Sequence, residues 1–163
     1  MEPLLDRDDE ENGPSNLSQQ ALWFSIHTGL ALGSWLLLMF LGYALNPPGV
    51  SQLLILLLSL FVPLAVGYFV THARQDEMAG LVWLVGLIWV LIISLWILDM
   101  PTGPNACFQC DATEKLTRTF FSLPKPSGLI DNDGPFLGTW PAAALIGYSI
   151  GARFALRRKR ARG

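Results

Sequence analysis

Charged side chains are scarce in this chain, and its long apolar stretches almost lack them. Of the 163 residues, 15% are Asp, Glu, Lys or Arg and 52% are hydrophobic, whereas an average soluble domain has about 25% charged residues. The sequence also contains no phosphate-binding loop, no Ser–His–acid set and no carboxylate pair within an apolar stretch. We therefore expect a membrane protein without catalytic residues of its own, and neither an ion-coupled transporter nor a nucleic-acid-binding protein.

Long uncharged runs are what the sequence does contain. Residues 78–98 are uncharged and apolar all round, and a helix of that length crosses the ~30 Å hydrocarbon core of a bilayer. Three further apolar runs occur in the chain, and turns rich in Pro, Gly or charged residues separate the runs from one another. The pattern predicts an all-α integral membrane protein, a bundle of four transmembrane helices with spans at about 21–45, 51–72, 78–99 and 138–156.

Charge divides the rest of the chain into tails and a loop. Residues 1–16 are acidic and are expected to be a disordered tail, while residues 157–163 form a basic tail. Basic residues favour the cytoplasmic side, so both termini are predicted to be cytoplasmic and the long loop 100–137 to lie outside. Arginine outnumbers lysine, which fits a GC-rich bacterial genome and an inner-membrane location.

Small residues recur every four positions in the first and last predicted spans, which places them on one helix face. Such stripes let another helix backbone approach closely. They can pack on one another inside one bundle, or one of them can face a second protein chain. The first stripe is Ser25, Gly29 and Gly33, and the second is Ala143, Gly147, Gly151 and Ala155.

The only two cysteines, Cys107 and Cys110, have the C-x-x-C spacing of a redox disulfide or half of a zinc site. The topology places His27 and His72 across the membrane from them, so we predict no metal site. A disulfide that closes the loop is the structural interpretation. The alternative is thiol–disulfide exchange or quinone-linked redox chemistry by this pair.

The two histidines are expected in the cytoplasmic half of neighbouring spans. A histidine pair on adjacent helices can hold a haem, and tryptophans in the third span can pack on a pigment or quinone. The structural interpretation is that His27 and His72 satisfy interfacial hydrogen bonds, and we predict no cofactor.

The basic tail is expected to contact anionic lipid headgroups. Its cationic residues are Arg157, Arg158, Lys159, Arg160 and Arg162. Together these features favour an accessory or scaffolding subunit that binds the bilayer and other membrane subunits or a second copy of itself. The alternatives are a thiol–disulfide or quinone-linked redox protein and a pigment- or lipid-binding subunit.

Overall fold

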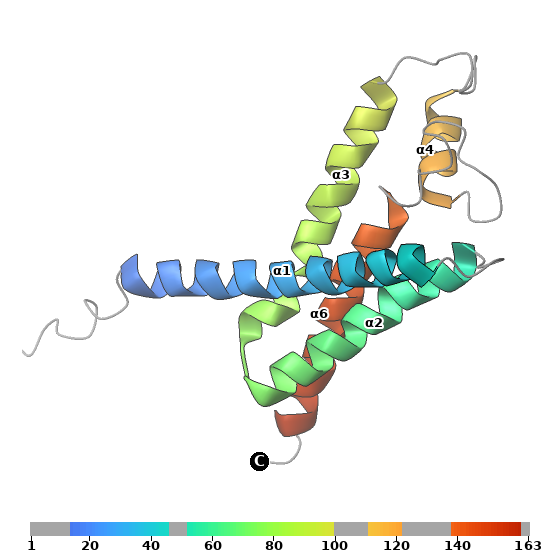
Figure 1. Cartoon of the computed structure of the whole chain (residues 1–163). Coiled ribbons are helices and arrows are strands. Elements are labelled where there is room, and N and C mark those ends of the chain that lie inside the picture. The colour runs from blue at the N-terminus through green and yellow to red at the C-terminus, as the bar shows by residue number, and fades with distance from the viewer. Residues whose placement is uncertain (1–13, 46–51, 100–110, 122–137, 161–163) are drawn as a thin grey trace, which may run out of the picture.

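The computed structural model describes residues 14–45, 52–99, 111–121 and 138–160, and within these ranges the chain is helical with no strand. This confirms the predicted all-α class. The elements, shown in Figure 1, are α1 (Pro14–Leu45), α2 (Gln52–Ala73), the 3-10 helix η1 (Glu77–Leu81), α3 (Trp83–Asp99), α4 (Ala112–Phe121) and α6 (Thr139–Arg160).

Three of these segments are long and apolar enough to cross a membrane. They are Leu17–Gly42, Leu53–Ala73 and Glu77–Asp99, with 26, 21 and 23 residues. The prediction of a membrane protein is confirmed to this extent. The fourth predicted span, α6, falls outside this set because small residues and a basic end lower its hydropathy.

The helix bounds differ from the predicted ones at three places. α1 begins at Pro14, inside the predicted tail, and α6 continues to Arg160, so the first residues of the basic tail are helical. The third apolar segment is not one helix, because η1 ends at Leu81 and α3 begins at Trp83. Asp76 starts this segment as the N-cap of η1, accepting a hydrogen bond from the Met78 backbone N at 2.9 Å.

The tightest packing joins α2 and α6. A Cβ atom added at Gly147 would collide with the carbonyl of Leu60, and one added at Gly151 would collide with the carbonyl of Leu64. This pairing shows that the two helices run in the same direction. Only glycine permits backbones to lie this close. The least apolar of the four long helices therefore lies at the centre of the molecule.

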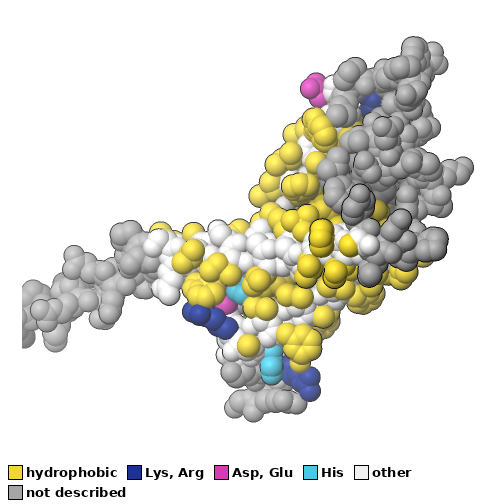
Figure 2. Space-filling model, in the orientation of Figure 1, with side chains coloured by type: hydrophobic (Ala, Val, Ile, Leu, Met, Phe, Trp, Pro, Cys, Tyr) yellow, Lys and Arg dark blue, Asp and Glu magenta, His cyan; other side chains and the backbone are white. Residues whose placement is uncertain are grey.

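Helix α1 is attached differently. It contacts α2, α6 and η1, and Figure 1 shows it crossing α6 at a steep angle, which departs from the regular packing of a bundle. Its buried residues recur every four positions at His27, Ala31 and Trp35, so a single face of α1 meets the other helices. Hydrophobic side chains cover much of the surface of α1 and α3, as Figure 2 shows.

Helix α4 lies at the far end of α3, beside the first turn of α6. The Thr139 hydroxyl donates a hydrogen bond to the backbone O of Phe120. Beneath α4 lies an apolar cleft of about 530 Å³, whose lining includes Val90, Phe120 and Ile146. The described part of the predicted outer loop thus packs against the helices it connects.

Candidate functional site

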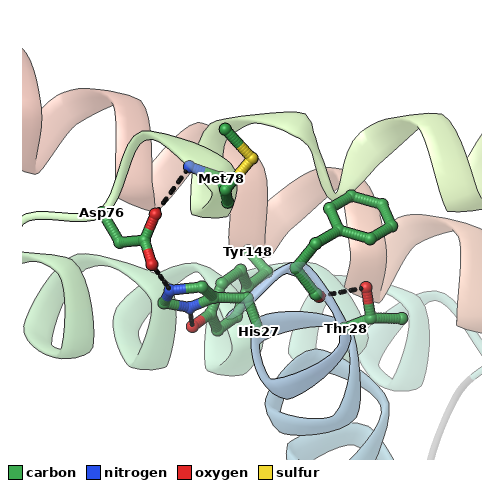
Figure 3. Close-up of polar contacts among 6 residues, drawn as sticks. His27, Thr28, Asp76, Met78 and Tyr148 are labelled. Carbon is green, nitrogen blue, oxygen red and sulfur yellow. Dashed lines mark hydrogen bonds and ion pairs between the residues drawn. The ribbon is translucent and has the colours of Figure 1, made fainter. Parts of the chain in front are cut away.

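His27 is the buried ionisable side chain of α1, with 1% of its surface exposed. It lies in the first half of that helix, on the face that meets η1 and α6. In Figure 3 its ring lies between Asp76, from the turn after α2, and Tyr148, from the middle of α6. Three segments far apart in the sequence therefore meet at one imidazole.

Both ring nitrogens of His27 face polar groups. Nδ1 lies 2.7 Å from the Tyr148 hydroxyl, and Nε2 lies 3.6 Å from Oδ2 of Asp76. With the proton on Nε2, the neutral ring accepts a hydrogen bond from Tyr148 and directs its N–H toward the carboxylate. The first contact is a hydrogen bond, whereas the second is an electrostatic contact too long to be one.

The turn between α2 and α3 holds α1 at a second point. The guanidinium carbon of Arg74 lies 3.5 Å from the ring centroid of Trp23, a close cation–π contact. Trp23 is one helical turn before His27, and the centroids of their rings are 6.3 Å apart. Arg74 and Asp76, which lie in the same turn, thus contact side chains one helical turn apart on α1.

Two of the three side chains in this His27 cluster (His27, Asp76 and Tyr148) are buried, and the Asp76 side chain is 16% exposed. The buried ones are His27 and Tyr148, and no group of three His, Cys, Asp or Glu side chains able to hold a metal occurs in the ranges that the structure describes. A carboxylate, an imidazole and a phenol in series can fix a helix in one rotational position. The geometry of this cluster therefore fixes the position of α1 relative to α6 and the turn after α2.

His72 lies apart from this cluster. It is exposed and its ring stacks on that of Tyr68, with the centroids 5.8 Å apart and the planes 4° from parallel. Among the described contacts, none joins His72 to His27. Because both nitrogens of His27 face groups of the chain itself, the structure does not bring the two histidines together on a common ligand.

The two small-residue stripes have different surroundings. Ser25, Gly29 and Gly33 are exposed, and a Cβ added at either glycine would meet nothing within 4 Å among the described residues. The second stripe packs on α2 through Gly147 and Gly151, described above. Ala155 in the same stripe is buried, and Ala143 lines the apolar cleft beneath α4. The two stripes therefore do not pack on each other.

The remaining predicted residues lie at or beyond the limits of the described chain. Cys107, Cys110 and Arg162 lie outside the described residues, as do the side chains of Lys159 and Arg160. Arg157 and Arg158 are exposed on the last turns of α6, and Arg158 donates a hydrogen bond to the Tyr68 hydroxyl at 2.9 Å.

Sequence reasoning found His27 but missed both of its partners. Asp76 had a detectable signal, because the topology puts the turn at 72–77 on the same side of the membrane as the start of the first span. Tyr148 had only a weak signal, as a tyrosine in the middle of a predicted span. Its pairing with His27 depends on the rotation of α6 about its axis, which spacing alone does not specify.

No family model, no curated protein and no solved structure matches this chain. Support for a function therefore comes from the geometry of the described residues.

Proposed function

We propose that this protein is an accessory subunit of a membrane complex, in which α1 binds a transmembrane helix of another membrane protein. The observation that carries the proposal is the open Ser25, Gly29 and Gly33 stripe on a helix whose other face is fixed by His27, Ala31 and Trp35. The Ser25 hydroxyl donates to the backbone O of Ala21 at 2.9 Å, so no polar group blocks the stripe. Small residues facing lipid gain little, whereas facing a helix they permit close backbone contact.

The proposal includes a topology in which α6 is a fourth span. Residues 139–152 of α6 are uncharged, and their low hydropathy is compatible with a span because much of this helix packs on α2, α3 and α1. The basic end of α6 lies beside the end of α2, since Arg158 reaches Tyr68 there. By the positive-inside rule this end is cytoplasmic, with both termini on that side of a bacterial inner membrane and α4 on the outer side.

Site-specific photo-crosslinking in the native membrane tests the helix-binding role. A photoreactive residue at Ser25 is expected to give an adduct with one transmembrane segment of another protein, identified by mass spectrometry of the crosslinked peptide. The same group at Leu91, an exposed residue of α3, is the lipid-facing control. Equal yields of adduct at both positions would contradict the proposal. A crosslinked dimer of this chain as the only product would also contradict it.

A pair of substitutions adds a matched control. Gly29→Ile with Gly33→Ile fills the stripe and is expected to abolish the Ser25 adduct. Gly42→Ile makes the same kind of change at an exposed glycine outside the stripe, with no described residue within 4 Å of the added Cβ, and should leave the adduct intact.

The redox alternative depends on Cys107 and Cys110. A Cys110→Ser variant distinguishes it from the accessory role: loss of oxidation of an external thiol substrate, with normal assembly and abundance, would favour redox chemistry.

A further inference from the structure

A shallow pocket of about 240 Å³ lies at the basic end of α6, where this helix packs against η1. It is separate from the His27 cluster and from the stripe on α1. Its lining combines two cationic, one acidic and several apolar or small residues: Glu77, Gly80, Leu81, Arg153, Leu156 and Arg157. Nothing in the proposed scaffolding role uses this pocket.

Arg153 is held in place by its contacts with the start of the third span. Its Nε donates a hydrogen bond to the backbone O of Gly80 at 3.2 Å, and its guanidinium carbon lies 5.9 Å from the centroid of the Trp83 ring. A Cβ added at Gly80 would lie 3.5 Å from Cγ of Arg153, so the side-chain stem runs along the glycine. Within the described ranges these contacts engage Nε, and the two terminal nitrogens can donate to a further acceptor.

Arg157 follows Arg153 by four residues and therefore lies on the same face of α6. Like charges at this spacing on a helix repel each other weakly, and an anion bound between them would relieve that repulsion. Glu77 supplies one negative charge at the opposite wall, which leaves the pocket with a net positive charge. Asp76 does not add to it, because its carboxylate caps η1 and faces His27.

We propose that this pocket binds the phosphate group of an anionic phospholipid, with Arg153 and Arg157 as donors and Leu81 and Leu156 in contact with the acyl chains. Guanidinium groups suit this role because they bind phosphate oxygens through paired hydrogen bonds. Basic pockets between membrane helices on the cytoplasmic side are typical headgroup sites. The inference rests on the proposed topology, which puts the pocket at the cytoplasmic headgroup level.

The pocket's apolar wall distinguishes a lipid from a free anion. Leu81 is 39% exposed and lies beside the arginines, although it starts an apolar span. A free phosphate would leave this wall in contact with water, whereas a phospholipid covers it with hydrocarbon. Trp83, next to the arginine, is of the type that lies at the membrane interface.

Native mass spectrometry of the detergent-purified, delipidated full chain tests the proposal. The protein is titrated with phosphatidylglycerol and, separately, with phosphatidylcholine. We expect phosphatidylglycerol to bind about tenfold more tightly, as a charge-assisted hydrogen bond would give. Equal binding of both lipids, or displacement of phosphatidylglycerol by an equal concentration of inorganic phosphate, would overturn the proposal.

Variants locate the binding in the pocket. Arg153→Gln with Arg157→Gln is expected to weaken phosphatidylglycerol binding about tenfold. Arg158→Gln removes the same charge from the neighbouring face, where Arg158 is paired with Tyr68, and should change binding less than about twofold because ions screen distant charges. An equal loss in both variants would mean that only the overall charge of the tail attracts lipid.

Two further variants keep the test valid if loss of the Arg153 contacts unfolds the protein. Arg157→Gln alone is expected to weaken phosphatidylglycerol binding severalfold, and Glu77→Gln to strengthen it, because the competing carboxylate is gone. If neither variant changes binding, the pocket is not the site.

The readouts separate this inference from the accessory role. The double arginine variant should keep the Ser25 adduct, and the Gly29→Ile and Gly33→Ile variant should keep phosphatidylglycerol binding. Loss of lipid specificity with the adduct intact refutes the lipid site alone. Recovery of the chain in the soluble fraction without detergent refutes both.

Discussion

Helices α6 and α1 meet the rest of the molecule in opposite ways. Most residues of α6 between Trp140 and Ala155 are buried, and the helix contacts the α2 backbone at Gly147 and Gly151. α1 is mostly exposed and is fixed by the His27 cluster and the contact of Arg74 with Trp23. Close backbone contact can thus hold the least apolar of the four long helices at the centre, while polar contacts hold the more apolar α1 at the edge.

The comparison also separates hydropathy from burial. Hydropathy measures how well a helix tolerates lipid, so it identifies α2 and α3, whose outer faces contact lipid under the proposed topology. A helix whose faces pack mainly on other helices does not need apolar side chains to face lipid, and it can be rich in Ala, Gly and Ser. This is why α6 lacks the composition of a span although it has the most buried position.

The largest expected effect comes from adding one methyl group to the α6 interface. Gly151→Ala would drive the new Cβ into the Leu64 carbonyl and to within 3.0 Å of the Tyr68 backbone N. We expect the free energy of unfolding to fall by about 2 kcal/mol or more, as overpacking does, measured by denaturation in detergent micelles. Gly33→Ala on the exposed stripe is the control and should be neutral or slightly stabilising. A mild Gly151→Ala would mean that the helices separate more easily than their contact suggests.

Removal of the phenol from the His27 cluster should have an intermediate effect. Tyr148→Phe leaves Nδ1 of His27 buried without its partner at 2.7 Å, which is expected to cost about 1–3 kcal/mol of unfolding free energy. A double-mutant cycle with His27→Ala should show coupling of about 1 kcal/mol. Additive effects would indicate that the two side chains act independently and that α1 is held by packing alone.

The surface contact of the same turn should matter less. Arg74→Gln removes the charge above Trp23 but keeps a long polar side chain, and we expect a loss of about 0.5–1 kcal/mol in unfolding free energy. With Trp23→Leu as background, Arg74→Gln should have little further effect. An undiminished loss in that background would assign the role of Arg74 to some other contact.

The smallest effect on stability is expected where the effect on assembly is greatest. Gly29→Ile with Gly33→Ile should change the unfolding free energy of the isolated chain by less than about 1 kcal/mol, because no residue that the structure describes lies within 4 Å of either Cβ position. The same variant is predicted to lose its partner helix in the membrane. A large destabilisation of the isolated chain would show that the stripe is an internal contact surface.

Much of the fold follows from local sequence properties, whereas the site depends on how helices rotate against one another. Runs without charge predict the apolar segments closely, and the spacing of four puts Gly147 and Gly151 on one face. The spacing of these glycines does not predict that their face of α6 packs on α2. It also does not predict that the stripe on α1 is exposed. The break between η1 and α3 was also missed, since every residue there is compatible with a continuous helix.

Asp76 has two attachments with one carboxylate. One oxygen caps the first turn of the third span through Met78, and the other faces His27 on α1. A tilt of α1 would therefore displace the first turn of the third span as well, as long as Asp76 keeps both contacts. The position of α1 and the start of the third span are thus linked through a single side chain.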